Sequence, residues 1–165
     1  MARTRRWDPC VSHRAGAVEG FIAEYFAGPD RSVLFVGGAG FDPRSTAVAQ
    51  RIAAVAPALR AVLLQENRPR PPQGLVERAT DNTRRLTQTL AGAVVEPIEI
   101  FGPDGAVVGG RNAVAVIARQ DFDDLTDVVV DSSALAYWIP VQILEAEVDL
   151  VARDSGFATA PGLGA

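Results

Sequence analysis

Residues 31–54 read RSVLFVGGAGFDPRSTAVAQRIAA, and this stretch decides the fold. The apolar run at residues 33–36 has charge on one side and glycine on the other, which is typical of a strand buried on both faces. Gly37, Gly38 and Gly40 follow at once. Because glycine permits positive φ angles and a close approach to the backbone, these residues predict a turn directly after the strand.

A helix is predicted to begin at this turn. Ser45 or Thr46 serves as its N-cap, and the apolar periodicity extends over residues 47–56. The free N–H groups and the helix dipole would point into the turn, and such an arrangement is typical of an anion or ribose site. We therefore expect a nucleotide-type ligand at the glycine turn.

Asp42 and Arg44 are the polar residues of the turn that we expect to face a ligand. A carboxylate accepts hydrogen bonds from ribose hydroxyls, and a guanidinium binds phosphate or carboxylate groups. The alternative is structural: Asp42 caps the helix, and Arg44 pairs with it in solvent. The sequence leaves both interpretations open.

Two phosphate-binding fingerprints are absent from the sequence. The glycines are spaced G-G-x-G and not G-x-G-x-x-G. No G-x-x-x-x-G-K-[ST] loop occurs, and the chain contains no lysine. We therefore do not expect phosphoryl transfer of the P-loop kind.

Three more strands are predicted at residues 60–65, 94–101 and 128–130, with a short hairpin strand at 106–108. The other predicted helices lie at residues 12–26, 75–90, 109–119 and 134–151. This alternation predicts an α/β fold, a three-layer Rossmann-like sandwich. Its sheet would be mostly parallel, with four to five strands and helices on both faces. We expect a single domain over residues 1–154 and a flexible tail over 155–165.

Polar residues follow two of these strands. Glu66 comes at the carboxyl end of one strand, where it would accept hydrogen bonds from ribose hydroxyls; its alternative is a solvated loop position. Asp131 and Ser133 follow the strand at 128–130. Asp131 is either functional, as a base or a ligand acceptor, or a cap, and Ser133 or Ser132 caps the next helix. Because parallel strands end at one edge of a sheet, we expect these residues to face the glycine turn.

Three other segments bear on the site. The proline-rich residues 67–74 form either a flap over it or a stiff connection. Gly109 and Gly110 open a helix, either for close packing or for anion binding. The helix at 75–90 is predicted to have a solvent-facing side that carries Asp81, Asn82, Arg84 and Arg85.

The composition excludes several classes of function. The 165 residues are 48% hydrophobic and 22% charged, which suits a globular domain, and the net charge of −4 provides no basic surface for nucleic acid. Cys10 and His13 are single representatives of their types, so we expect no disulfide framework and no Cys/His zinc site. No run reaches the ~18 apolar residues that span a membrane. We expect a cytoplasmic protein.

The seven residues 38–44, GAGFDPR, resemble the first motif of class I SAM-dependent methyltransferases of the leucine carboxyl methyltransferase type. The resemblance implies SAM contacts at Gly38, Gly40 and Arg44, and an acidic ribose partner at the end of the next strand. The whole strand-turn-helix plan is more loosely similar to Rossmann-like ligand-sensing domains of bacterial immunity systems. That second resemblance implies a bacterial protein that binds a ligand without catalysis.

Three hypotheses follow from these observations. The chain is a sensor or regulatory domain that binds a nucleotide-type small ligand, or a SAM-dependent methyltransferase, or a non-catalytic interaction or oligomerisation protein. The cofactor would be SAM or a nucleotide, and no catalytic residue is assigned. A homo-oligomer or a larger assembly is compatible with each hypothesis.

Overall fold

The fold is built on a four-stranded parallel sheet. The computed structural model describes residues 11–136, 138–144 and 146. The strands of the sheet are β1 (Ser32–Gly38), β2 (Ala58–Asn67), β3 (Val94–Glu99) and β4 (Asp127–Val130). Their spatial order is β3-β2-β1-β4, and each neighbouring pair is parallel. This is the start of the doubly wound order, so the predicted α/β class is confirmed and is compatible with a Rossmann-like fold.

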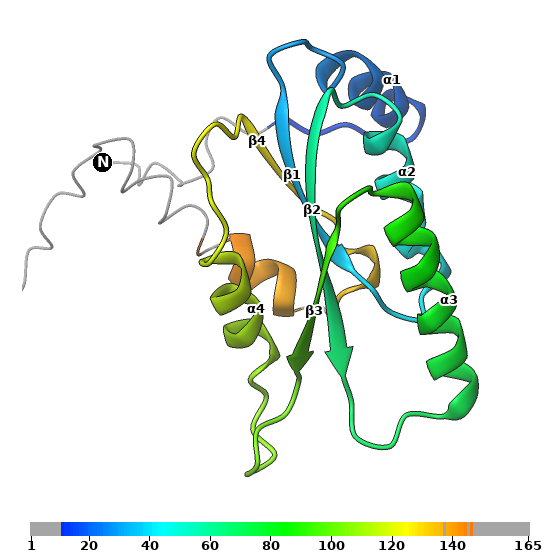
Figure 1. The fold of residues 1–165 in the computed structure, drawn as a ribbon, viewed down its shortest axis with the longest axis vertical. Coiled ribbons are helices and arrows are strands. Elements are labelled where there is room, and N and C mark those ends of the chain that lie inside the picture. The colour runs from blue at the N-terminus through cyan, green and yellow to red at the C-terminus, as the bar shows by residue number, and fades with distance from the viewer. Residues whose placement is uncertain (1–10, 137, 145, 147–165) are drawn as a thin grey trace, which may run out of the picture.

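Helices connect the strands. They are α1 (Gly16–Tyr25), the short 3₁₀ helix η1 (Pro43–Thr46), α2 (Ala47–Ala53), α3 (Gln73–Thr89), α4 (Gly109–Ile117) and the 3₁₀ helix η2 (Ser132–Ala134). Residues 138–144 are also helical. In Figure 1, α2 and α3 lie on one side of the sheet, and α4 and the helix over 138–144 lie on the other.

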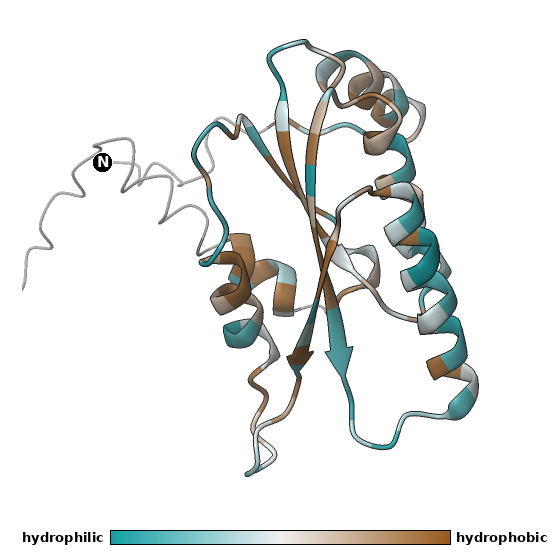
Figure 2. Ribbon diagram, viewed as in Figure 1, coloured by the Kyte–Doolittle hydropathy of each residue, from teal (hydrophilic) through white to brown (hydrophobic). Residues whose placement is uncertain are grey.

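The core fills both faces of the sheet because consecutive strand side chains point to opposite sides. Leu34 of β1 and Leu64 of β2 pack in one cluster with α4 and the helix over 138–144. Phe35 and Leu63 pack in a second cluster with α2 and α3. In Figure 2, hydrophobic residues concentrate on the strands and on α4, whereas much of α3 is hydrophilic. Among the described residues, no helix is both long and apolar enough to cross a membrane.

The glycine turn begins two residues later than predicted. Gly37 and Gly38 belong to β1 and pair with Leu63 and Leu64 of β2. A Cβ atom added to Gly38 would lie 2.6 Å from the carbonyl oxygen of Ala134, so glycine is needed there for close packing of the chain against itself. Tertiary contacts therefore set the end of this strand.

The C-terminal part departs most from the prediction. The helix predicted over 134–151, with a kink or a division at Pro140, is interrupted earlier: η2 ends at Ala134, residues 135 and 136 are not helical, and residues 138–144 are helical. The predicted hairpin strand at 106–108 forms only an isolated antiparallel bridge, Phe101 with Val107. The predicted tail, 155–165, lies outside the described residues.

One predicted helix start changes, whereas α4 begins at Gly109 as predicted. The first helix begins at Gly16 and not at residue 12. At α4, the glycine pair serves packing: a Cβ on Gly109 would lie 2.8 Å from Ile100 Cδ1, and one on Gly110 would collide with the Gln142 side chain. These contacts support the packing interpretation of Gly109 and Gly110.

Candidate functional site

A pocket of ≈ 580 Å³ lies at the carboxyl edge of the sheet. Its walls come from the turn after β1, the end of β2, the first turns of α3, and the segment that follows β4. In a sheet of this order, the connections of β1 and β4 leave toward opposite faces, and ligands bind beside that point. The volume also lies within the ~300–1,000 Å³ typical of small-molecule sites.

The pocket brings together most of the residues predicted from the sequence. Its lining includes Gly40, Asp42, Arg44, Glu66 and Ser133. The remaining predicted residues are not part of the lining: these are Gly37, Gly38 and Asp131.

Asp42 and Arg44 form a closed unit at the rim of the pocket. One Asp42 oxygen, Oδ1, accepts from the backbone N–H and from Nε of Arg44, both at 2.9 Å, and Oδ2 accepts from Nη2 at 2.6 Å. Asp42 is thereby the N-cap of η1. The hydrogen bond from the Arg44 side chain lowers the pKa of Asp42 to about 2. The structural interpretation of this pair therefore holds, although both residues also line the pocket.

Asn82 of α3 holds the glycine turn through two hydrogen bonds. Its Nδ2 donates to the carbonyl oxygens of Gly40 at 2.9 Å and Asp42 at 3.0 Å. The prediction that Asn82 faces solvent is wrong, because the residue is 8% exposed. The signal was its spacing: Asn82 precedes Leu86 and Leu90 by four and eight residues, which places all three on one face of α3.

Glu66 is the penultimate residue of strand β2 and joins three parts of the pocket wall. Its Oε1 accepts from the backbone N–H of Ala136 at 2.6 Å, and its Oε2 accepts from Nε (3.2 Å) and Nη2 (2.5 Å) of Arg68. The side chain is 11% exposed, so the alternative of a solvated loop position is wrong. A carboxylate has about four acceptor sites, so one remains open on Oε1 for a ligand hydroxyl.

Asp131 caps η2. Its Oδ1 accepts from the backbone N–H of Ser133 at 2.9 Å, and the residue is 6% exposed. Of its two predicted roles, the structure supports capping. Ser133 is therefore not the cap; its hydroxyl is buried without a hydrogen-bond partner among the described residues, and the residue lines the pocket.

A proline-rich rim borders the pocket. Arg70 has a φ of 52° and stands between Pro69 and Pro71, although residues before proline favour extended backbone. Within the described part of the chain, its guanidinium makes no hydrogen bond or ion pair. Both Arg70 and Arg68 line the pocket.

Phe41 lines the pocket but was not among the site residues predicted from the sequence. Its side chain is 43% exposed, which is high for a large aromatic ring, and it lines the pocket beside Asp42. The sequence signal that could have been used is an aromatic residue directly after the glycines. A flat ring offers a stacking surface to a planar ligand.

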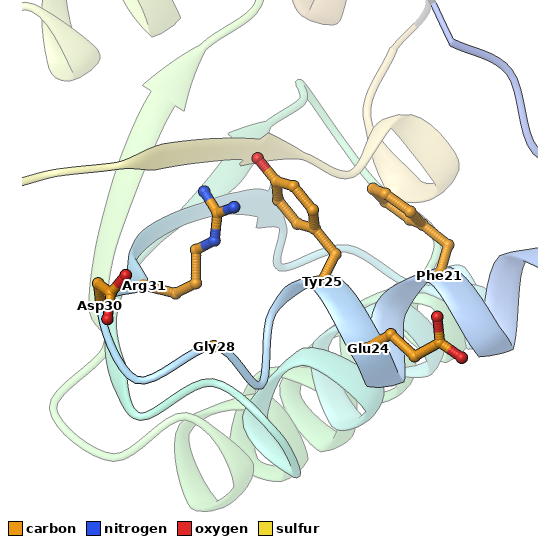
Figure 3. Close-up of a pocket in the computed structure, with 6 residues that line it drawn as sticks. All are labelled: Phe21, Glu24, Tyr25, Gly28, Asp30 and Arg31. Atoms are coloured by element: carbon orange, nitrogen blue, oxygen red, sulfur yellow. The ribbon is translucent and has the colours of Figure 1, made fainter.

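A second hollow, of ≈ 440 Å³, lies beside α1 near the amino ends of β1 and β4 (Figure 3). The Tyr25 hydroxyl donates to Asp127 Oδ1 at 2.9 Å, and the Arg31 guanidinium lies 3.9 Å from the Tyr25 ring centre. Arg31 also pairs with Asp127 at 3.3 Å. The hydrogen bond to Asp127 raises the pKa of Tyr25. These contacts tie α1 to β4, and none of the predicted site residues lies there.

Among the described residues, no group of three His, Cys, Asp or Glu side chains could hold a metal ion. No protein-family model matches the chain, and no curated protein is similar to it.

Proposed function

We propose that this chain binds a nucleotide-type small ligand in the carboxyl-edge pocket and acts as a sensor or regulatory domain. The observation that carries the proposal is the convergence of Gly40, Phe41 and Asp42 from the β1 turn with Glu66 from the end of β2 around one pocket. Two different strands supply these groups. A pocket with a few converging polar groups at this edge is the usual place for a ligand in such a sheet.

Each part of the ligand has a complementary group. The open acceptor site of Glu66 suits a ribose hydroxyl. The exposed ring of Phe41 suits a nucleobase, and base stacking on aromatic side chains contributes about 1–3 kcal/mol. Gly40 leaves room between them, because a Cβ there would meet only the Ala134 carbonyl oxygen, at 3.5 Å.

A sensor role is supported by the ion pairs that the carboxylates of the pocket form. Both carboxylates are engaged by arginines, Asp42 by Arg44 and Glu66 by Arg68. The pKa of Asp42 is lowered, whereas a general base at neutral pH needs a pKa near 7. These groups hold the walls of the pocket together and are poorly suited to proton transfer.

A second candidate is a SAM-dependent methyltransferase. It is supported by the position of Glu66, which ends the strand next to the glycine turn and shares a pocket with Gly40 and Arg44. The resemblance of residues 38–44 implies this arrangement. Methyl transfer depends mainly on positioning, so it does not require a strong base.

A thermal-shift screen tests the proposal. Purified protein is heated with SAM, S-adenosylhomocysteine, NAD(P), ATP, GTP, cyclic oligonucleotides and the four ribonucleosides. A ligand that binds only the native state raises Tm by mass action. A shift with nucleosides or nucleotides supports the sensor, and similar shifts with SAM and S-adenosylhomocysteine support the methyltransferase. A well-folded protein that responds to none of them would overturn both and favour an interaction or oligomerisation protein.

A further inference from the structure

We infer that the pocket contains an anion subsite, formed by Arg70 and the backbone N–H groups of the β1 turn, which binds a phosphate or carboxylate group of the ligand. This inference rests on the proposed function and narrows its ligand class. It follows from three features of the pocket: the balance of its charges, the backbone of the proline-rich rim, and the N–H donors of the turn.

The charged side chains of the pocket leave one positive charge uncompensated. The lining contains two carboxylates and three arginines. Asp42 pairs with Arg44, and Glu66 pairs with Arg68, so each pair is close to neutral. Arg70 is the remaining cation and makes no ion pair or hydrogen bond within the described part of the chain. The lining is therefore positive in a chain whose net charge is −4, and an anionic group would compensate it.

The proline-rich rim holds Arg70 in an unusual backbone conformation. Residues other than glycine rarely adopt its φ of 52°, and Pro69 and Pro71 restrict the backbone on both sides. No hydrogen bond or ion pair of Arg70 among the described residues accounts for this strain. Strained backbone beside a pocket is often part of ligand binding. The exposed guanidinium is thus carried on a stiff segment, and its planar donors match a phosphate or a carboxylate.

The β1 turn supplies backbone donors to the same pocket. The N–H groups of Gly40, Phe41 and Asp42 donate to no acceptor among the described residues, and all three residues line the pocket. The Gly40 carbonyl oxygen is bound by Asn82, which is not part of the lining. Because N–H and C=O point in opposite directions across a planar trans peptide, the N–H of Phe41 points away from Asn82. Successive free N–H groups in a turn form anion-binding concavities.

These groups together complement a nucleotide. Glu66 retains an acceptor site for a ribose hydroxyl, and the exposed ring of Phe41 offers a stacking surface to the base. Arg70 and the turn donors are then available for the phosphate. An amino-acid carboxylate, such as that of SAM, presents similar acceptor oxygens and is the other source of an anion that the subsite would take.

Isothermal titration calorimetry of each ribonucleoside and its 5′-monophosphate tests the inference. Wild-type protein should bind at least one monophosphate about tenfold more tightly than its nucleoside. Arg70→Gln keeps a polar side chain but removes the charge, so the affinity for that monophosphate should fall about tenfold while the affinity for the nucleoside stays the same. Arg111→Gln is the matched control, because Arg111 is an exposed residue of α4 outside the pocket, and it should keep the wild-type preference.

A second pair of ligands identifies the source of the anion. S-adenosylhomocysteine carries an amino-acid carboxylate that 5′-deoxy-5′-methylthioadenosine lacks. A preference for S-adenosylhomocysteine that Arg70→Gln abolishes assigns the subsite to a carboxylate. A preference for monophosphates that Arg70→Gln abolishes assigns it to a phosphate. Either result supports the inference.

The outcomes separate the inference from the proposed function. Wild-type protein that binds the uncharged member of every pair as tightly as the anionic one, or more tightly, overturns the inference and leaves the proposed function intact. A preference that Arg70→Gln leaves unchanged overturns it as well. If Arg70→Gln fails to fold, Arg70→Asn takes its place, because asparagine tolerates a positive φ. Folded wild-type protein that binds neither ligand of any pair removes the proposed function itself.

Discussion

Glu66 accepts a hydrogen bond at 2.6 Å from the backbone N–H of Ala136, a residue 70 positions further along the chain. This bond fastens the end of β2 to the segment between η2 and the helix over 138–144. The same carboxylate holds Arg68 on the proline-rich rim. The Glu66 side chain therefore connects the end of β2 both to the proline-rich rim and to the segment that contains Ala136.

Replacing Glu66 should separate its structural and ligand-binding roles. Glu66→Ala leaves the half-buried N–H of Ala136 without its acceptor and should cost about 1–3 kcal/mol of unfolding free energy. Glu66→Gln keeps an acceptor oxygen and loses mainly the ion pair with Arg68, so its cost should be about 1 kcal/mol or less. Urea denaturation measures both. Equal losses in the two variants would mean that the bond to Ala136 contributes little.

Asn82 should contribute to both the stability of the fold and ligand binding. Asn82→Ala removes both hydrogen bonds to the turn and should cost about 1–3 kcal/mol, with weaker ligand binding. The matched control is Asn112→Ala, whose amide donates to the Glu99 carbonyl oxygen outside the pocket. Denaturation and ligand titration of both variants provide the comparison. Ligand affinity that falls equally in the two would contradict a specific role for Asn82.

The two glycines on either side of Ala39 should respond differently to alanine. Gly38→Ala places a Cβ 2.6 Å from the Ala134 carbonyl oxygen, so η2 must shift, at a cost of about 1–3 kcal/mol. At Gly40, the nearest atom lies at an ordinary 3.5 Å. Gly40→Ala should therefore be neutral or stabilising by up to about 1 kcal/mol. Thermal melting of the two variants compares their stabilities. A lower Tm for Gly40→Ala than for Gly38→Ala would refute the predicted difference.

The Asp42–Arg44 unit should make stability depend on pH in the acid range. Folding lowers the pKa of Asp42 from 3.8 to about 2, so its stabilising contribution is complete above the unfolded value. The contribution is lost as pH falls toward about 2. The stability difference between wild type and Asp42→Asn should therefore be constant above about pH 5 and shrink below pH 3.8. A carboxyl NMR titration that placed Asp42 near 3.8 would contradict this.

Most of the sheet could be predicted from the sequence, because buried strands leave a strong local pattern. Each of the four strand predictions coincides with a strand, since continuous runs such as residues 33–36 and 128–130 suit a position covered on both faces. The ends of the elements were less predictable. Gly37 and Gly38 read as a turn, but pairing with β2 draws them into the strand. The break after Ala134 has no comparable local pattern in the sequence.

The site was predictable as far as strand ends determine it. Gly40, Asp42, Arg44, Glu66 and Ser133 meet in one pocket because parallel strands end at the same edge. What each side chain contacts was not predictable. Asn82 reaches the turn from 40 residues away, and Glu66 binds a backbone group 70 residues later. Such contacts depend on how helices lie against the sheet, which local patterns do not encode.

The most direct test of the central claim is isothermal titration calorimetry of wild-type protein and Gly40→Val with the ligand that gives the largest Tm rise. We expect saturable binding to wild type. In Gly40→Val, which places branched carbons into the pocket at a position with space for Cβ, binding should be lost while Tm stays close to that of wild type. Equal binding to both proteins would place the ligand elsewhere and contradict the account.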